Sequence, residues 1–231
     1  MRILALDAAT EACSVALLSG DALISRTIES GKSNAAKILS MAEEVLAEAQ
    51  VALSMLDAIA ASIGPGTFTG VRISVAVAQG LAFGADLKVV PITTLEALAL
   101  QVIEEQDRRA LACLDARMGE VYWGCFAADA ASGVVPTGAL HVGPPGNVAL
   151  DPVARYLGVG RGFSAYPILA TLPGVTIDAT RSAALPNARE IARLGALRLM
   201  TGGLDAADLK PLYLRDKVAF TEAERTAQSS L

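Results

Sequence analysis

The chain has 231 residues, of which 53% are hydrophobic and 19% are charged, and its net charge is −5 at neutral pH. A chain of this length and hydrophobicity can bury on the order of 70% of its unfolded surface, which excludes disordered, fibrous and disulfide-scaffold proteins. Nucleic-acid binding depends on Lys and Arg displacing counterions from phosphates, so this acidic chain is a poor candidate for holding nucleic acid by itself.

Cysteine and histidine usage indicates the compartment and limits the chemistry. The three cysteines lack metal-ligand spacing, which is typical of reduced thiols in the cytosol. His141 is the only histidine, so sites that need two imidazoles are excluded. Asp7 ends the first apolar run before it reaches signal-peptide length. The uncharged run between Arg72 and Asp86 is too short to cross a bilayer, so we expect a cytoplasmic protein without a membrane anchor.

The first half of the chain predicts three strands followed by alternating helices and strands. The strands 3–7, 12–18 and 22–28 are joined by tight turns, which indicates an antiparallel meander. A helix follows, capped by Ser33 or Asn34. Beyond it we expect a strand over 56–63, a helix over 68–83 ending at Gly84, a strand over 88–92 and a helix over 95–105.

The second half starts the same pattern again. Residues 4–8 (Leu-Ala-Leu-Asp-Ala) are echoed by residues 112–116 (Ala-Cys-Leu-Asp-Ala), and each copy leads into a turn and a second strand. Residues 134–142 supply the third strand of the second copy, and we expect a strand over 156–159 and a helix over 187–201. We therefore expect an α/β protein with two lobes, residues 1–106 and 107–220, and a frayed tail over 221–231.

The most informative segment is Gly64-Pro65-Gly66-Thr67, which stands between a predicted strand and a predicted helix. Two glycines around a proline favour a tight turn with Thr67 as helix cap. Free N–H groups at a helix start also favour an anion, so a phosphate cradle is the alternative, although no Lys-Ser or Lys-Thr pair follows as in a P-loop.

The helix after this turn carries a stripe of small residues. Gly70, Ser74, Ala78 and Ala82 are spaced by four, which lets another structural element approach closely. The stripe packs either against the chain's own sheet or against a helix of a second subunit, and periodicity alone does not choose between them.

Two carboxylates follow equivalent predicted strands. Asp7 precedes Ala8-Ala9-Thr10, and Asp115 is its counterpart in the second copy. Strand-end carboxylates that face each other across two lobes can hold a metal–nucleotide, with Asp7, Thr10 and Asp115 as weak nucleotide contacts. The alternative is that each carboxylate caps the backbone of its own turn.

Four stretches together resemble the TsaB (YeaZ) family: residues 7–17 (DAATEACSVAL), 64–73 (GPGTFTGVRI), 115–123 (DARMGEVYW) and 211–215 (PLYLR). The resemblance implies two ribonuclease-H-like lobes of the actin/Hsp70/sugar-kinase superfamily (ASKHA). It also implies a role in making N6-threonylcarbamoyladenosine beside the anticodon of tRNAs that read codons beginning with A.

Within that family resemblance, the chain is the non-catalytic dimerisation and activation subunit. Its partners are a TsaD-type catalytic subunit and a TsaE-type ATPase, it forms a homodimer when alone, and it meets tRNA only through the complex. Pairing through the first two helices, about 34–50 and 67–83, makes Ile38 and Val45 interface residues together with the small stripe.

The chain departs from the family pattern in two places that affect cofactors. The paired histidines with which TsaD-type proteins bind a metal on the first helix are missing, and Asn34 stands where many TsaB relatives have a single histidine before that helix. Ala9 replaces the glycine that gives phosphate room in nucleotide-binding relatives. We therefore expect no cofactor on the isolated chain, with ATP or ADP restricted to the interface with a partner.

The competing hypothesis is an enzyme in its own right, either a stand-alone actin-fold ATPase or a glycoprotease-like peptidase. The ATPase requires Asp7, Thr10 and Asp115 to hold the metal–nucleotide. The peptidase is hard to build with one histidine and no His-Glu-x-x-His pattern.

Overall fold

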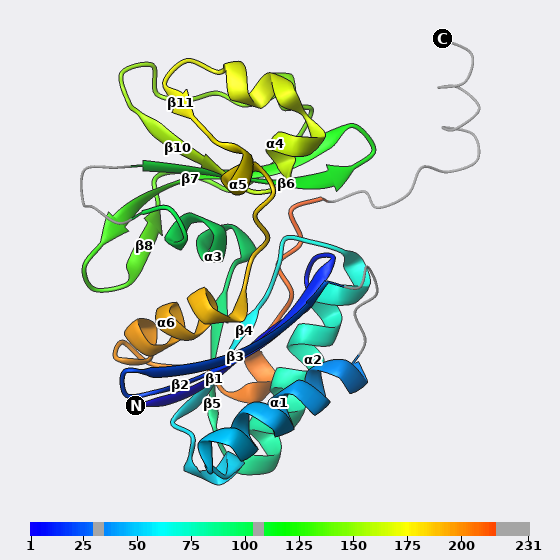
Figure 1. The fold of residues 1–231 in the computed structure, drawn as a ribbon, viewed down its shortest axis with the longest axis vertical. Helices are drawn as coiled ribbons and strands as arrows, with labels where there is room; N and C mark the ends of the chain where they lie inside the picture. Colours follow the sequence, from blue (N-terminus) through cyan, green and yellow to red (C-terminus); the bar gives the residue numbers. More distant parts are fainter. Residues whose placement is uncertain (30–34, 104–108, 216–231) are drawn as a thin grey trace, which may run out of the picture.

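The computed structural model describes residues 1–29, 35–103 and 109–215 and shows two stacked α/β lobes (Figure 1). The first sheet contains β1 (Arg2–Asp7), β2 (Ala12–Ser19), β3 (Ala22–Glu29), β4 (Ala58–Ser62) and β5 (Lys88–Ile92). The second contains β6 (Arg109–Arg117), β7 (Glu120–Asp129), β8 (Gly133–Pro136), β9 (His141–Gly143), β10 (Tyr156–Val159) and β11 (Val175–Thr176). The main helices are α1 (Ala35–Ala49), α2 (Phe68–Ala85), α3 (Thr94–Leu100) and α6 (Ala188–Leu199), and two short ones are α4 (Gly162–Ala165) and α5 (Ala179–Ser182).

The two sheets share one topology. Their strand orders are β3-β2-β1-β4-β5 and β8-β7-β6-β10-β11, with β9 pairing separately with β7. In each sheet the first three strands are antiparallel neighbours, and the last two run parallel to the central strand. This repeat confirms the predicted pair of ribonuclease-H-like lobes of the actin/Hsp70/sugar-kinase type.

Local sequence signals explain most of the elements in the first lobe. Ile38, Met41, Ala42 and Val45 recur at helical spacing and bury one side of α1, which lies with α2 on one face of the first sheet (Figure 1). Thr67 caps α2 by accepting a hydrogen bond from the backbone N–H of Gly70, as predicted. The predicted stop of this helix at Gly84 is wrong.

The true end of α2 is set by a left-handed residue. Asp86 has a φ of 55°, and its N–H donates to the carbonyl of Ala82, so the helix passes through Gly84 before it ends. Among the described helices, α2 alone is long and apolar enough to cross a bilayer by length and composition. In this structure one of its sides packs in the core of the first lobe.

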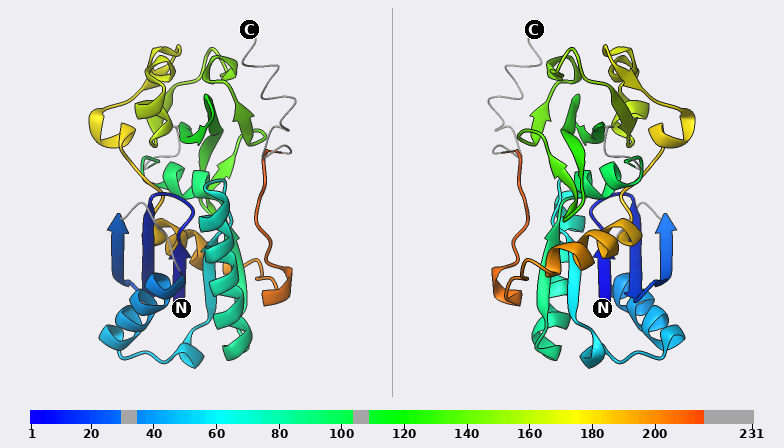
Figure 2. Two further views of the ribbon diagram at one scale, coloured as in Figure 1. Left: turned by 90° about the vertical axis from the view of Figure 1, so that its right-hand side faces the viewer. Right: turned by 90° about the vertical axis from the view of Figure 1, so that its left-hand side faces the viewer.

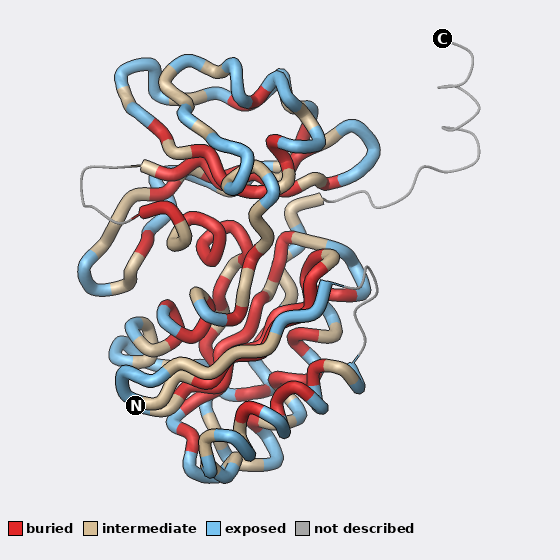
Figure 3. Tube along the Cα trace, in the orientation of Figure 1, coloured by how far each residue is buried: buried red, intermediate tan, exposed pale blue. Residues whose placement is uncertain are grey.

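One hydrophobic core joins the lobes. It contains residues of both sheets together with α3 and α6, which lie between them (Figures 1 and 3). Ile3 and Ala60 come from the first sheet, Ala110 and Phe126 from the second, and all four are buried. Because this core is continuous, the lobes are held together by packing. Polar contacts also join them at the cleft between the lobes, which lies beside the loop after β1 and the end of β6.

The chain returns to the first lobe after the second sheet. Helix α6 packs on β1, β2 and β4, and the segment 203–215 runs alongside α2 (Figure 2). The predicted boundary at 106/107 therefore separates the two sheets, but residues 188–210 pack mainly on the first lobe, and the segment that follows ends at Arg215, which binds Glu120 and the Ala116 carbonyl of the second lobe. Contiguous sequence did not reveal this return.

The structure also differs from the sequence prediction in two elements. The strand expected over 134–142 is interrupted, because Thr137 binds the carbonyl of Cys125 through both its N–H and its hydroxyl, and β8 and β9 form on either side. The helix expected over 95–105 ends at Leu100. Ser33, Asn34 and the tail 221–231 lie outside the described residues.

Candidate functional site

Asp7 ends β1 inside the protein and not at its surface. Its carboxylate is fully buried, and Oδ1 accepts hydrogen bonds from Ser62 Oγ at 2.5 Å and from the Ala9 N–H at 3.0 Å. The hydroxyl oxygens of Ser62 and Ser74 are 3.1 Å apart, and Ser74 Oγ accepts from the Ala8 N–H at 2.8 Å. Asp7 therefore ties β1 to β4 and α2, and no solvent-facing oxygen is left for a nucleotide.

Burial raises the pKa of Asp7 from 3.8 to about 6, and hydrogen bonds from Ser62 and Ala9 lower it by less. Between pH 4 and 6 the folded protein keeps a proton on Asp7 that the unfolded chain has released. The contribution of this proton to stability is therefore complete below about pH 4 and is lost as pH rises through about 6.

We predict that Asp7→Asn removes this pH dependence. The free energy of unfolding of the variant minus that of the native chain is expected to be about 3 kcal/mol larger at pH 7.5 than at pH 4. Urea titrations at the two pH values measure this difference, and equal differences at both would contradict it.

The glycines of the 64–70 segment allow two backbones to touch. A Cβ at Gly66 would lie 2.2 Å from the Ala9 carbonyl oxygen, and one at Gly70 would lie 2.0 Å from that of Ala8. The Thr67 N–H donates to the Ala9 carbonyl at 2.7 Å. The start of α2 is therefore occupied by the chain's own loop after β1, which supports the turn-and-cap interpretation over the phosphate cradle.

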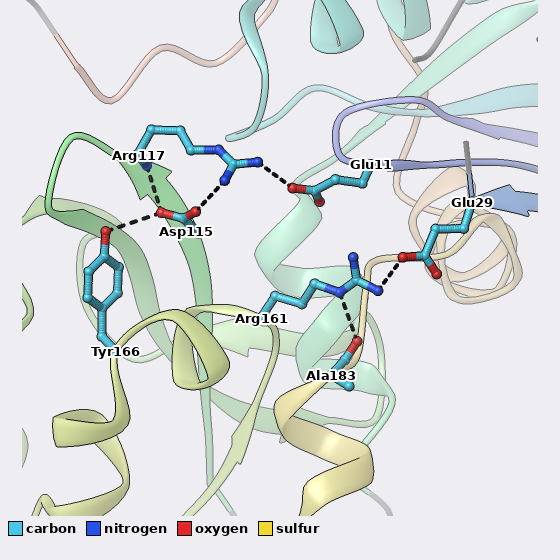
Figure 4. A network of polar contacts seen from close by, with 7 residues as sticks. All are labelled: Glu11, Glu29, Asp115, Arg117, Arg161, Tyr166 and Ala183. Carbon is cyan, nitrogen blue, oxygen red and sulfur yellow. Dashed lines mark hydrogen bonds and ion pairs between the residues drawn. The ribbon is translucent and has the colours of Figure 1, made fainter. Parts of the chain in front are cut away.

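Asp115 is engaged by its neighbours at the other side of the cleft (Figure 4). Its Oδ1 accepts from the Arg117 N–H at 2.8 Å and from the Tyr166 hydroxyl at 3.2 Å, and its Oδ2 lies 2.9 Å from Arg117 Nη1. The same guanidinium reaches Glu11 of the first lobe, with Nη2 2.8 Å from Oε1. Asp115 thus positions an arginine that bridges the lobes.

A second arginine bridges the same cleft. Arg161 pairs with Glu29 of β3 and donates from Nε to the Ala183 carbonyl at 3.2 Å (Figure 4). The cavity between these bridges, bordered by Thr10 and Asp115, has a volume of about 60 Å³. Drug-sized ligands occupy roughly 300–1,000 Å³, so this cavity by itself is smaller than a nucleotide site.

Asp7, Thr10 and Asp115 therefore do not form the nucleotide site that was one sequence-based alternative. Asp7 is sealed below the cleft, Thr10 is 6% exposed, and Asp115 is paired with Arg117. Within the described ranges, no three His, Cys, Asp or Glu side chains come close enough together to hold a metal ion.

The predicted interface residues also require a correction. Gly70, Ser74, Ala78 and Ala82 are all buried, and they face the chain's own sheet and the loop after β1. Ile38 and Val45 of α1 are fully buried in the same core. None of the six presents a surface to a second molecule, so the intramolecular alternative for the stripe is the correct one.

Sequence reasoning missed the opposite side of α2. Arg72, Ala76, Gly80 and Phe83 are exposed there, and we call them the outer α2 face. A Cβ at Gly80 would meet no atom within 4 Å, and Phe83 is 85% exposed. The signal was present, since Arg72, Ala76, Gly80 and Gly84 are also spaced by four.

Comparisons with known proteins agree on one family. The family model described as TsaD, tRNA N6-adenosine threonylcarbamoyltransferase, matches residues 28–222. The chain is 34% identical to the tRNA threonylcarbamoyladenosine biosynthesis protein TsaB of Escherichia coli, over 95% of this chain and 97% of that protein. The Haemophilus influenzae TsaB is also 34% identical, over 95% and 96%. The solved structure of YeaZ from Pseudomonas aeruginosa is 39% identical with a TM-score of 0.83, covering 92% of this chain and 99% of that one.

Proposed function

Because the chain belongs to the TsaB (YeaZ) family, we propose that it takes part in forming N6-threonylcarbamoyladenosine on tRNA. Its role is that of a non-catalytic subunit that binds and activates a TsaD-type catalytic subunit in the cytoplasm. A TsaE-type ATPase joins this complex, and the chain pairs with a second copy of itself when the catalytic subunit is missing.

The observation that carries this proposal is the outer α2 face. A phenylalanine that is 85% exposed, on the same side of a helix as Ala76 and Gly80, leaves apolar surface in water and backbone open to close approach. Small residues at a helix surface let a second helix pack tightly against the first. Leu39 of the neighbouring helix α1 is also exposed, so both helices contribute apolar surface to a partner.

The cleft supports an accessory role. Asp7 is fully buried, with Oδ1 held by Ser62 and the Ala9 N–H, and Arg117 and Arg161 bridge the lobes where a substrate would enter. His141 stacks on Trp123, with ring centroids 5.1 Å apart, in the second lobe. These contacts favour neither the ATPase nor the peptidase, and we propose that any ATP or ADP binds only where a partner completes the site.

Activation then works through differential binding. The chain binds one conformation of the catalytic subunit more tightly and raises its population, by no more than the difference in binding free energy. A lasting interface of this kind buries about 1,600 Å² in total, which requires more than Phe83 alone and is consistent with use of both helices.

The deciding experiment reconstitutes the reaction with the TsaD-type and TsaE-type subunits of the same organism. We expect the chain to co-purify with the catalytic subunit, and tRNA threonylcarbamoylation to depend on its presence. If modification proceeds equally well without the chain, or if the isolated chain transfers the group by itself, the proposed role is wrong.

We predict that the isolated chain binds tRNA weakly, with a dissociation constant above about 10 μM at physiological salt, because its net charge is −5. Fluorescence anisotropy with labelled tRNA at several salt concentrations measures this. Submicromolar binding that weakens steeply with salt would contradict the expectation that tRNA is met only through the complex.

A further inference from the structure

A larger cavity lies beside the start of α2 and adjoins the small one between the lobes, with which it shares Gly66, Thr67, Ala116, Arg117 and Tyr122 as lining residues. It has a volume of about 290 Å³ and is bordered by the start of α2, the end of β6 with Tyr122 of β7, and the segment 212–215. Three segments that are far apart in the sequence thus build it. Its size is near that of sites that accept a small ligand or a single large side chain.

Aromatic rings line this cavity and reach the solvent. Phe68 is 48% exposed and Tyr213 is 50% exposed, with ring centroids 6.3 Å apart, and Tyr122 is half-buried. Aromatic side chains left partly exposed around a concave site are typical of places where a partner's side chain is buried. We call this cavity the Phe68 pocket.

Three arginines lie around the pocket, and carboxylates neutralise two of them. Arg117 pairs with Glu11 and Asp115, and Arg215 pairs with Glu120. Among the described residues, Arg72 has no carboxylate partner.

The guanidinium of Arg72 is held in place by aromatic rings. Its Cζ lies 3.4 Å from the centroid of Phe68, and its Nε donates to the Tyr213 hydroxyl at 2.8 Å. Within the described residues its two terminal amino groups make no hydrogen bond. A fixed planar fork of this kind binds a carboxylate through two parallel hydrogen bonds.

We propose that the Phe68 pocket receives one large apolar side chain of a partner protein, and that Arg72 binds a carboxylate beside that side chain. This inference rests on the proposed function, because Phe68 and Arg72 lie on the same exposed side of α2 as Ala76, Gly80 and Phe83. The pocket is then an anchor at one end of the outer α2 face.

The charge pattern favours a protein occupant over RNA. The chain is acidic overall, and two of the three arginines near the pocket are already neutralised by carboxylates. RNA binding needs several unpaired cations along the phosphate backbone, whereas a protein segment with one carboxylate needs only Arg72.

A first experiment tests the pocket without any partner. The probe is 3-phenylpropionate, titrated into the full chain by NMR, with the neutral 3-phenylpropanamide as its matched control. We expect the acid to bind at least about 10-fold more tightly than the amide, and Arg72→Gln to abolish this preference. If neither probe binds near Phe68, or if both bind equally, the assignment of the pocket is overturned.

A second experiment measures affinity for the TsaD-type subunit. Phe68→Ala and Arg72→Gln are each expected to weaken pairing by about 30-fold, as residues that anchor a partner side chain in a desolvated pocket do, while both variants keep the native thermal transition. Ile168→Ala, an exposed apolar residue of the second lobe, is the control and is expected to pair normally.

The outcomes separate this inference from the proposed function. If the native chain does not pair with the TsaD-type subunit at all, the proposed function fails and the probe titration still decides the pocket. If pairing is normal in both variants, the pocket inference alone is overturned. The pocket inference is also overturned if the variants pair normally and lose only the affinity of the assembled complex for tRNA. A further outcome that overturns it is a probe that binds only to a chain from which residues 216–231 have been removed.

Discussion

Replacing Gly70 with alanine is expected to lower the free energy of unfolding by about 3 kcal/mol or more, which is the upper range for forcing extra volume into a packed interior. The added Cβ would lie 2.0 Å from the Ala8 carbonyl oxygen and 2.6 Å from Thr67 Oγ1. Neither atom can retreat cheaply, because Thr67 Oγ1 caps α2 and Ala8 is fixed to Ser74 Oγ by its N–H.

The sign of this effect is opposite to helix propensity, and the same helix supplies the control. Alanine normally stabilises a helix by about 0.5–1 kcal/mol relative to glycine. Gly84→Ala, with no atom within 4 Å of the added Cβ, is expected to show that gain. Urea unfolding of both variants measures the contrast, and a Gly70→Ala chain as stable as Gly84→Ala would show that the loop after β1 does not press on α2 as described.

The Gly70 contact also determines which substitutions can report on partner binding. Leucine at Gly70 or at Ser74 disrupts the packing of Ala8 against α2, and at Ser74 it also removes the hydroxyl that binds the Ala8 N–H. Loss of pairing in such variants would reflect misfolding. The informative substitutions lie on the other side of the helix.

The sequence predicted the local elements well because their signals are local. Alternating apolar residues, tight turns and the cap Thr67 placed most strands and helices of the first lobe within a few residues. The echo of Asp7 in Asp115 correctly indicated two copies of one topology. It did not indicate that the surroundings of the two carboxylates differ. Asp7 is buried by Ser62 and Ser74, which come from elements far from it in the sequence.

The small stripe shows the limit of periodicity more directly. A spacing of four identifies residues on one side of a helix but not what that side contacts, and both sides of α2 carry such a spacing. Ser74 and Ala78 face inward, whereas Ala76 and Gly80 face outward. Only tertiary packing distinguishes these positions, since all four residues are small.

Replacing Gly80 with glutamate is expected to weaken pairing with the TsaD-type subunit by more than about 100-fold, and to reduce threonylcarbamoylation accordingly. A charged side chain at the centre of a helix contact must be buried without a partner or must hold the helices apart, and an unpaired buried charge costs several kcal/mol. Within the chain the substitution meets open space, so the free energy of unfolding should rise by about 0.5 kcal/mol through helix propensity.

Two controls make the result specific to the outer α2 face. Gly80→Ala also raises helix propensity, with a single uncharged methyl group, and is expected to pair nearly normally. Gly138→Glu introduces the same charge at an exposed glycine of the second lobe, where a Cβ also meets no atom within 4 Å, and should leave pairing intact. If Gly80→Glu is more stable than the native chain and yet does not activate its partner, the defect lies in the binding surface and not in folding. If Gly80→Glu pairs and activates like Gly138→Glu, the outer α2 face is not the site of docking, and another surface must supply the contact.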